Sequence, residues 1–411
     1  MYKEITNCRL NGSKKLTSVL NLGNQYLTGI FPKTKNEVVS KGILELVWCE
    51  DSKLLQLNHS FSLDEMYGDN YGYRSGLNKS MVAHLQNKIE LLTGKILLEK
   101  GDIVIDIGSN DATTLKAYKN KNIIRIGIDP TGKKFKKYYT DNIILIDDFF
   151  PTNRFNEQYK GKKAKIITSI AMFYDLENPL SFVQSISEFL HEDGIWHLEQ
   201  SYLPSMLKTN AYDTICHEHL EYYTLENIKY LVEKCGMKIL DVQINDINGG
   251  SFAVTVGHKN SNSYPENIAV INWLLDQEER MGLDTAKPFK DFSDRVFQHR
   301  TDLKELIIAL KKEGKKIIGY GASTKGNVLL QFCELTENEI PFIAEVNEDK
   351  FGHYTPGTKI PIISEKEARA MNPDYFLVLP WHFKNSILSK ETEFIRNGGK
   401  FIFPLPYIEI I

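Results

Sequence analysis

A cluster of titratable side chains at positions 212–223 is the densest group of chemically active residues in the chain. Within twelve positions it holds two histidines, three carboxylates and three tyrosines. Histidine and glutamate are the usual general bases near neutral pH. The cluster therefore predicts a site that abstracts a proton, and its candidate catalytic and substrate-binding residues are Cys216, His217, Glu218, His219 and Tyr222.

Two other interpretations of this cluster stay open. A metal site is the first, but H-E-x-x-H is not met, because the fourth position after His217 is Glu221, and a bare His-x-His is a weak metal signal. The second is structural, since a single histidine is more often a hydrogen-bonded core residue. His197, Glu199 and Tyr202 end a predicted strand, and they either support the same cleft or pack within the sheet.

A second chemical feature is an acidic turn between an apolar strand and a helix, at positions 104–115. Asp129 ends the next predicted strand, about 20 residues after Gly108, where an acid can bind an adenosine ribose. NAD and S-adenosylmethionine (SAM) share that ribose, but carboxylates in the turn would repel a pyrophosphate and attract the cationic SAM. The turn therefore favours SAM over a nucleotide or a purely structural turn, with Asp106, Gly108, Asn110, Asp111 and Asp129 as candidate cofactor-binding residues.

The next predicted strand, at positions 142–145, is followed by two acids and two phenylalanines. Asp148 is a candidate hydrogen-bond partner of the adenine amine, and Phe149 is a candidate for stacking on the adenine ring. The alternative is a helix N-cap followed by two core aromatic residues.

A second glycine-rich turn follows a strand at positions 316–327. A helix N-terminus beside Lys325 suits an anion, so Gly321, Ser323, Lys325 and Asn327 are candidate phosphate-binding residues of the substrate. The spacing G-x-x-x-x-G-K-[ST] of a P-loop is not met. Glu345 lies where a ribose-binding acid would follow, so an NAD site is the alternative.

The chain divides into three regions that differ in their predicted secondary-structure pattern, and these regions must position the candidate residues. Residues 1–80 carry short β-like runs, residues 81–260 alternate helical and strand patterns, and residues 261–411 begin with a charged helical stretch at 264–315, interrupted near 284–288, before the alternation restarts. Alternation of this kind predicts parallel sheets covered by helices. We therefore expect an α/β protein with two separate sheets.

Composition excludes several classes of protein. The chain has 411 residues, a formal net charge of −3 and five cysteines. A near-neutral balance argues against binding nucleic acid or an anionic membrane surface. No apolar run would span a bilayer, and residues 1–15 lack an apolar signal-peptide core. We expect a cytoplasmic protein with reduced thiols.

Together, these motifs resemble the three-domain nucleotide-sugar C-methyltransferases, of the mycarose and tetronitrose 3-C-methyltransferase type, over nearly the whole chain. The resemblance implies an N-terminal zinc-binding module, a central Rossmann-like class I SAM domain and a C-terminal Rossmann-like domain. It also implies a 4-keto-6-deoxy nucleotide sugar as acceptor, His219 as base, Glu218 as its partner and Tyr73 in the active site. The matching stretches are 19–23, 73–76, 106–115, 216–223, 249–251, 319–327 and 380–383.

Several positions depart from the family pattern. Its zinc ligands form two C-x-x-C pairs, whereas here Cys8 is paired with Asn11 and Cys49 with Ser52, so we expect no structural zinc. His59 and Asp51 are conceivable substitutes, but neither has a ligand spacing. Cys216 replaces an active-site tyrosine, so Tyr222 or Tyr223 is the alternative oxyanion donor. Phe173 or Tyr174 stands for a histidine, and Ala112 for a glycine.

Three other functions remain as alternatives. Methyl transfer to oxygen or nitrogen would use the same base without an enolate. An NAD-dependent enzyme would use the second glycine turn. A sugar-nucleotide-binding protein without catalysis would explain the changes at Cys216 and Phe173. The partner expected in each case is a small molecule, and the sequence leaves monomer and dimer open.

Overall fold

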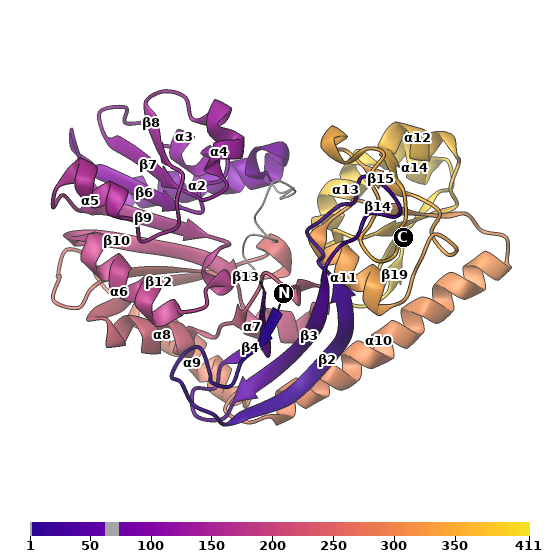
Figure 1. Cartoon of the computed structure of the whole chain (residues 1–411), viewed down its shortest axis with the longest axis horizontal. Coiled ribbons are helices and arrows are strands. Elements are labelled where there is room, and N and C mark those ends of the chain that lie inside the picture. Colours follow the sequence, from indigo (N-terminus) through magenta and orange to yellow (C-terminus); the bar gives the residue numbers. More distant parts are fainter. Residues whose placement is uncertain (1, 62–73) are drawn as a thin grey trace.

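The computed structural model describes residues 2–61 and 74–411, which form two lobes joined by a long helix and a long β-hairpin (Figure 1). One lobe contains the seven-stranded sheet and the other the six-stranded sheet. The predicted α/β class, with two separate sheets, is confirmed. Within the described ranges, we find no helix long and apolar enough to cross a membrane.

The N-terminal residues form a curved sheet whose edge strand comes from the central region of the chain. Its order is β11-β4-β3-β2, so the segment after the histidine cluster pairs with this module. Glu221 lies opposite Gln56, and Tyr222 opposite Leu55. The strands are β2 (Leu16–Tyr26), β3 (Lys41–Cys49), β4 (Leu55–Leu57) and β11 (Glu221–Tyr222), and a separate pair joins β1 (Tyr2–Glu4) to β5 (His59–Phe61).

The central sheet has the order β12-β13-β10-β9-β6-β7-β8. Six of its strands run in one direction, and β13 is antiparallel to its neighbours β10 and β12. Every residue of β6 is buried, as expected for a parallel strand covered on both faces. The strands are β6 (Ile103–Ile107), β7 (Ile124–Ile128), β8 (Ile143–Ile146), β9 (Ala164–Ile170), β10 (Leu190–Ser201), β12 (Met237–Asn245) and β13 (Ser251–His258).

Helices cover both faces of this sheet (Figure 1). They are α2 (Lys79–Lys95), α3 (Thr113–Lys116), α4 (Gly132–Phe135), α5 (Asn153–Tyr159), α6 (Pro179–Phe189), α8 (Leu225–Lys234) and α9 (Ile268–Arg280), whereas α7 (Leu203–Lys208) packs with the N-terminal module and α10. The chain leaves β6 toward β7 on one side and later returns to β9 on the other. This reversal of strand order creates the crevice in which open α/β sheets bind ligands.

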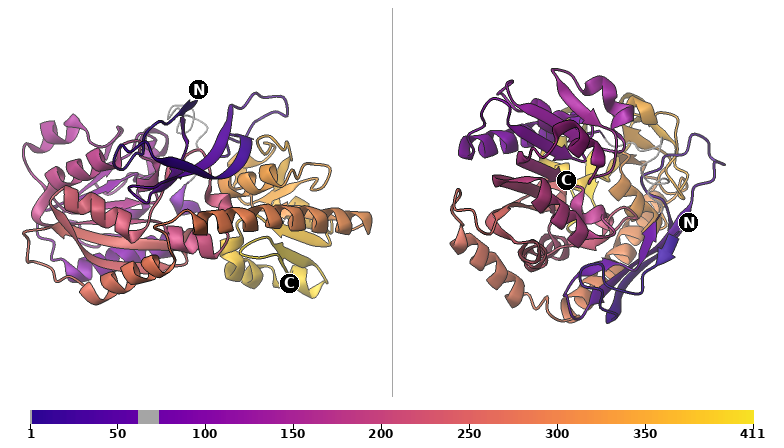
Figure 2. Two further views of the ribbon diagram at one scale, coloured as in Figure 1. Left: turned by 90° about the horizontal axis from the view of Figure 1, so that it is seen from below. Right: turned by 60° about the vertical axis from the view of Figure 1, so that its left-hand side comes forward.

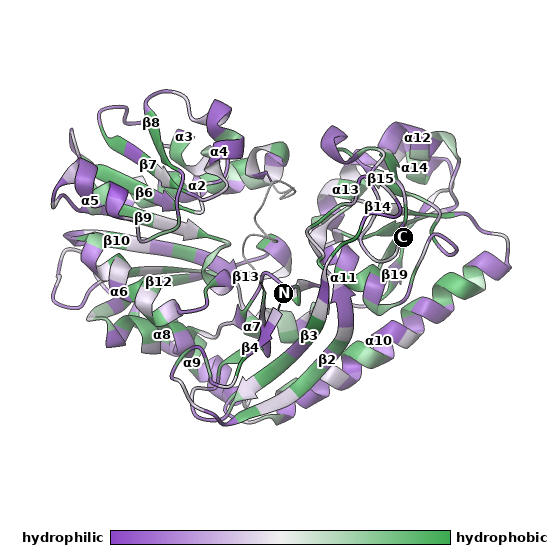
Figure 3. Cartoon of the chain, in the orientation of Figure 1, coloured by the Kyte–Doolittle hydropathy of each residue, from purple (hydrophilic) through white to green (hydrophobic). Residues whose placement is uncertain are grey.

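Helix α10 (Lys287–Lys312) spans the two lobes and lies along the N-terminal hairpin (Figure 2). Its apolar residues recur every three or four positions, which leaves charged residues on the opposite face (Figure 3). Pro288 lies in its first turn, where a missing N–H is tolerated, and this explains the break expected near 284–288. The buried face consists of Phe289, Phe292, Val296, His299, Leu303, Ile307 and Leu310.

The C-terminal sheet has the order β16-β15-β14-β17-β18-β19, and only β19 is antiparallel to its neighbour. The glycine turn therefore follows a central strand of this sheet. The elements are β14 (Ile317–Tyr320), α11 (Thr324–Phe332), β15 (Ile343–Glu345), β16 (Ile362–Ser364), α12 (Glu365–Ala370), β17 (Tyr375–Val378), α13 (Lys384–Lys390), α14 (Thr392–Arg396), β18 (Lys400–Phe403) and β19 (Glu409–Ile410).

Candidate active site

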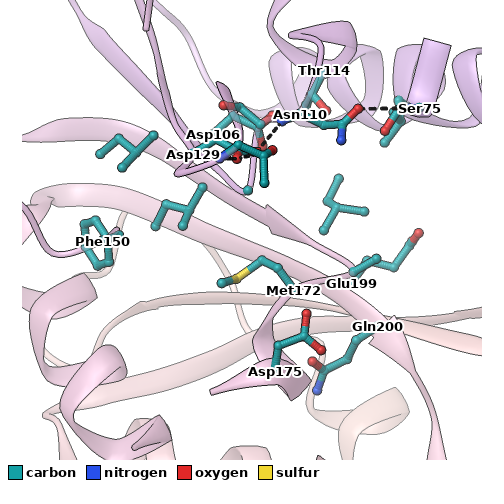
Figure 4. A pocket seen from close by; sticks show the side chains of 18 of the residues that line it. Ser75, Asp106, Asn110, Thr114, Asp129, Phe150, Met172, Asp175, Glu199 and Gln200 are labelled. Atoms are coloured by element: carbon teal, nitrogen blue, oxygen red, sulfur yellow. Dashed lines mark hydrogen bonds between the residues drawn. The ribbon is translucent and has the colours of Figure 1, made fainter. Parts of the chain in front are cut away.

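A pocket of about 250 Å³ opens at the carboxyl ends of β6, β7, β9 and β10. Asp106, Gly108 and Asp129 line one side, and Asp175 and Gln200 lie across from them (Figure 4). This is the crevice that the reversal of strand order creates. The described structure thus brings the first acidic turn and Asp129 together, as the sequence predicts.

Asp106 is the buried acid of this pocket. Its side chain accepts a hydrogen bond from Thr168 Oγ1 at 2.6 Å and is 2% exposed. Burial raises the pKa of Asp106 to about 7, with the nearby Asp129 adding to the effect. A bound cation would relieve this desolvation cost, because it stabilises the charged carboxylate. The pocket therefore fits a positively charged ligand such as the sulfonium or amino group of SAM.

The backbone of the turn is shaped for close approach of a ligand. Gly108 has φ +70°, and a Cβ there would lie 3.1 Å from Met172 Cγ. Ala112 has φ +62° and is fully buried. That left-handed conformation favours glycine, which explains why glycine is usual at this position in the family.

Asp129 ties two strand ends together. Its Oδ2 accepts a hydrogen bond from the Asn110 backbone N–H at 2.7 Å, and its Oδ1 accepts bonds from the backbone N–H and hydroxyl of Thr131. A carboxylate offers about four acceptor positions, so roughly one remains for a ribose hydroxyl. Asp129 lines the pocket, but it also holds the turn that shapes it.

Asn110 and Asp111 differ in what they face. Asn110 lines the pocket, and its Oδ1 accepts from the Ser75 backbone N–H at 3.1 Å. Asp111 is not among the lining residues. It accepts from the Gly76 N–H at 3.0 Å and lies 3.7 Å from Arg74 Nε. The structure therefore places Asp111 as an anchor for the segment before α2, not as a cofactor contact.

The candidates for adenine binding also separate. Asp148 accepts bonds from the Phe149 N–H at 2.8 Å and from Thr152 Oγ1 at 2.7 Å, and it is not a lining residue. Phe149 lines the pocket and is 47% exposed, which leaves its ring accessible for stacking. Phe150 also lines the pocket, with its ring centroid 5.2 Å from that of Phe182. Asp148 therefore holds the turn before α5 through Thr152, the N-cap residue of that helix, and does not face the pocket.

His219 lies in a smaller cavity next to the pocket. Tyr174 and Ser201 line that cavity with His219, whereas their chain neighbours Asp175 and Gln200 line the pocket. These two pairs of neighbours form the wall between the cavities. The His219 ring packs against the Tyr174 ring at a tilt of 56°, with centroids 4.2 Å apart. Position 174, not position 173, therefore lies beside the candidate base.

The protonation of His219 follows from its contacts. Its Nδ1 lies 2.8 Å from the Thr214 carbonyl oxygen, which can only accept a hydrogen bond. Nδ1 therefore carries the proton, and Nε2 holds the free lone pair. Burial, together with the positive charge of Lys325, lowers the pKa of His219 to about 3. The ring is therefore neutral at neutral pH, as a general base must be.

Glu218 and Cys216 form a second hydrogen-bonded pair beside His219. The Cys216 thiol donates to Glu218 Oε2 at 3.6 Å. Burial raises the pKa of Glu218 to about 7. A Cβ on Gly29 would lie 2.4 Å from Glu218 Oε1, so the glycine leaves room for this carboxylate. The Glu218 carboxylate thus contacts the N-terminal module at Gly29, where any larger residue would displace it.

Of the four candidate phosphate-binding residues in the second glycine turn, only Lys325 places a cationic group beside the site. Lys325 Nζ donates to the Asn248 carbonyl oxygen at 2.7 Å, across the two lobes. Ser323 caps α11 by accepting from the Gly326 N–H, and Asn327 donates to the Thr28 carbonyl oxygen. Gly321 has φ +84°, and a Cβ there would lie 2.7 Å from the Pro380 ring. These three residues hold the fold together.

Glu345 does not fit the NAD alternative. Its Oε2 accepts from the Ala322 N–H at 2.8 Å, and its Oε1 accepts from the N–H groups of Val346 and Asn347. Its carboxylate therefore holds the backbone around the glycine turn, and unlike Asp129 it lines neither cavity. A second contact between the lobes lies close by, where the Trp381 indole donates to Asp213 Oδ2 at 2.8 Å.

The other cluster residues separate by location. His217 is 1% exposed, packs edge-on against Phe61 with centroids 4.6 Å apart and lines neither cavity. Its place in the substrate site is therefore corrected: it packs against the N-terminal module. Tyr222 lines the small cavity with His219, whereas Tyr223 stacks on the core residue Phe173. Tyr73 lies outside the described residues.

The supporting residues at the end of β10 also separate. Glu199 lines the pocket and is bound by Lys88 Nζ at 2.7 Å and by His84 Nε2. Although burial opposes it, these partners lower the pKa of Glu199 to about 2. His197 contacts Thr255, and the Tyr202 hydroxyl donates to Glu278. Of the three, Glu199 lines the pocket, Tyr202 lines the cavity of His219, and His197 lines neither.

The four residues at the positions of the family's zinc ligands, Cys8, Asn11, Cys49 and Ser52, lie close together. Cys8 Sγ lies 3.1 Å from Ser52 Oγ, and the Cys49 thiol donates to Asn11 Oδ1 at 3.9 Å. Among the residues that the structure describes, no group of three or more His, Cys, Asp or Glu side chains could hold a metal ion. This donor set does not fit the four-coordinate site of a structural zinc.

Several lining residues escaped the sequence analysis, among them Met172, Gln200 and Asn248. These three come from segments far apart in the sequence and carry no motif of their own. Position alone could have pointed to Met172 and Gln200, because each lies near the carboxyl end of a parallel strand.

Comparison with known proteins agrees with this architecture. Three family models match in tandem: "Putative zinc binding domain" at residues 8–67, "Methyltransferase domain" at 81–242 and "C-methyltransferase C-terminal domain" at 246–406. The C-methyltransferase NovU of Streptomyces niveus is 29% identical over 415 aligned positions, which cover 100% of this chain and 98% of that protein.

Solved methyltransferase structures resemble part of the chain. A complex of the Trm112 methyltransferase activator with a methyltransferase from Haloferax volcanii matches at 17% identity and a TM-score of 0.37, covering 45% of this chain and 95% of that one. The CcbJ methyltransferase of Streptomyces caelestis matches at 8% identity and a TM-score of 0.34, covering 42% and 89%. The three tandem family models and the full-length relative show that the chain is a SAM-dependent methyltransferase, and that it is similar to C-methyltransferases over its whole length.

Proposed function

We propose that this enzyme methylates a carbon atom of a nucleotide-activated 4-keto-6-deoxy sugar through an enolate formed by His219. The observation that carries the proposal is the neutral His219 ring, whose Nε2 carries the lone pair, in a cavity lined by Tyr174 and Ser201, the chain neighbours of the pocket residues Asp175 and Gln200. SAM supplies an electrophilic methyl group when bound in the pocket. The chain supplies the base, the orientation and the stabilisation of charge.

A carbon nucleophile requires removal of a proton beside a ketone. His219 Nε2 takes that proton, and the electron pair moves onto the ketone oxygen as an enolate. A new bond from carbon to the methyl group then forms while the bond from sulfur to the methyl group breaks. The enolate oxygen needs a donor in a site shielded from water. The Tyr222 hydroxyl, which lines the His219 cavity and has no hydrogen-bond partner among the described residues, supports that role.

Lys325 supports a phosphate-bearing acceptor. It is partly buried at the junction of the two lobes, where its charge adds to the effect of burial in lowering the pKa of both His219 and His382. A diphosphate beside Lys325 would neutralise this charge and raise the pKa of His219 toward the working range of a base. Binding of the correct substrate would therefore strengthen the base.

We also propose that the N-terminal module folds without zinc. Hydrogen bonds of Cys8 with Ser52 and of Cys49 with Asn11 join the two loops that four thiolates would otherwise join through a metal. The Cys8 and Cys49 side chains are buried in the core shared with the central sheet. Packing against that core supports the loops in place of a metal.

Solvent exchange tests the proposed chemistry directly. The enzyme is incubated with S-adenosylhomocysteine, the demethylated product of SAM, and a UDP- or TDP-activated 4-keto-6-deoxyglucose in deuterium oxide. Enolate formation should place deuterium beside the ketone at a rate that the His219→Ala variant loses. Methylation without exchange would indicate transfer to oxygen or nitrogen, and would overturn the carbon assignment for this substrate.

A further inference from the structure

Gln200 is a buried amide without a partner in the wall between the two cavities. The side chain is 2% exposed, and neither its Nε2 nor its Oε1 has a hydrogen-bond partner among the described residues. It nevertheless lines the pocket, beside Asp175 and across from Asp106 and Asp129 (Figure 4). A buried amide left unsatisfied is costly, so such a group in a pocket points to a ligand that completes it.

The position of Gln200 in the sheet separates it from the cofactor end of the pocket. Asp129 ends β7, Asp106 lies on β6, and Gln200 lies on β10, with β9 between β6 and β10. Neighbouring strands lie about 4.8 Å apart, so Gln200 is about 10 Å from the strand of Asp106 and about 14 Å from that of Asp129. With adenosine at β7, the far end of the pocket is the side of the acceptor.

The neighbours of Gln200 point the same way. The next residue, Ser201, lines the cavity of His219. Two consecutive residues of β10 therefore line the cofactor pocket and the cavity of the candidate base. An amide is uncharged, so it neither repels a sulfonium nor competes with Asp106 for it. Its N–H₂ group donates and its carbonyl accepts, which suits a ligand with hydroxyl or keto oxygens.

We propose that Gln200 binds an oxygen atom, hydroxyl or keto, of the acceptor and positions the acceptor carbon between the transferred methyl group and His219. The inference deepens the proposed function and rests on it. Gln200 is a positioning residue that contacts the substrate, and its amide is left unpaired until the substrate arrives.

The test replaces Gln200 with methionine, which keeps the volume and removes the amide. Gln25 provides a matched control, because it is also 2% exposed with both amide atoms unpartnered, yet it does not line the pocket. Both variants are assayed for methyl transfer to UDP- and TDP-activated 4-keto-6-deoxyglucose, for SAM affinity by calorimetry and for thermal midpoint.

We expect Gln200→Met to lower kcat/KM for the acceptor by roughly 10-fold to 100-fold, as for loss of one buried hydrogen bond. SAM affinity should stay within about twofold of wild type, and the thermal midpoint should not fall, because the free protein loses no bond. Gln25→Met should leave all three values unchanged. Equal kcat/KM in Gln200→Met and wild type, or an equal effect of Gln25→Met, would overturn the proposal.

A structure with S-adenosylhomocysteine tests Gln200 without the acceptor. The proposal requires the Gln200 amide to face the open volume beside the cofactor sulfur. A direct hydrogen bond from Gln200 to the amino acid part of the cofactor refutes it. Failure of the proposed function would give a different result from failure of the role of Gln200, since the wild-type enzyme itself would then transfer no methyl group to either sugar.

Discussion

The His219 ring donates from Nδ1 to the Thr214 carbonyl oxygen, five residues earlier in the chain, at 2.8 Å. This bond fixes both the tautomer and the orientation of the ring, because a carbonyl cannot donate in return. The same loop carries Asp213, which holds Trp381 of the other lobe. The candidate base is thus oriented by its own loop, and that loop is anchored across the two lobes.

Removal of the base should abolish most turnover. We expect His219→Ala to lower kcat by about 10²-fold to 10⁴-fold, the usual value of a positioned base, with little change in SAM affinity. Steady-state kinetics and calorimetry measure the two quantities. His217→Gln serves as the control, since His217 lies outside both cavities. Full activity of His219→Ala would transfer the role to Glu218, which the Glu218→Gln variant then examines.

SAM affinity should depend on the charge of Asp106. Burial raises the pKa of Asp106 to about 7. In the free enzyme this carboxyl group is therefore largely protonated at pH 5.5, and it must lose its proton to bind a cation. Affinity should therefore rise with pH, by at most roughly tenfold per unit, and level off above about pH 8. Calorimetry from pH 5.5 to 8.5 measures the slope, and Asp106→Asn should bind weakly with no slope. An unchanged slope in that variant would assign the titration to another group.

The same linkage should appear in stability. An acid whose pKa is higher in the folded state than in the unfolded state adds stability at low pH and loses it as pH rises from about 4 through 7. Bound SAM should offset this loss for Asp106. The increase in thermal midpoint at saturating SAM should therefore be larger at pH 8 than at pH 5.5, as measured by calorimetric melting. An equal increase at both values would contradict the role of Asp106.

Replacement of Lys325 should affect the acceptor more than the donor. We expect Lys325→Gln to weaken binding of UDP or TDP by roughly 10-fold to 100-fold, because hydrogen bonds to charged groups contribute about 1.5–3 kcal/mol. Lys350 is a matched control, since its Nζ also donates to a backbone carbonyl, that of Ala322, at 2.8 Å. A similar loss in Lys350→Gln would mean that the effect is structural.

Zinc should be absent from the purified protein and should return when the thiols are restored. Elemental analysis should find no stoichiometric zinc in the wild type, whose Cys8 and Cys49 bond to Ser52 and Asn11. The Asn11→Cys, Ser52→Cys double variant should bind about one zinc per chain, because four thiolates close a tetrahedral site. About one zinc in the wild type, lost on Cys8→Ser, would refute the metal-free module.

The sequence by itself determined the elements and the main turn. The apolar run 103–107 predicts a buried parallel strand, and Gly108 predicts the sharp turn after it, because both follow from burial and local backbone sterics. The spacing to Asp129 predicts a meeting at one sheet edge, since parallel strands end on the same side. The motif-level resemblance predicted a SAM-dependent methyltransferase, which the comparisons show, whereas the nucleotide-sugar acceptor stays a prediction.

Only the tertiary structure decided which side chain of each local group faces the site. His217 and His219 are two residues apart, yet the first packs on Phe61 and the second lies beside the pocket, because the chain turns between them, with the His219 N–H donating to the Cys216 carbonyl oxygen at 3.2 Å. Asn110 and Asp111 separate in the same way. Loop orientation depends on contacts with distant segments, which no local pattern encodes. Gln200 became a candidate for the same reason, since its unpaired amide is a property of packing.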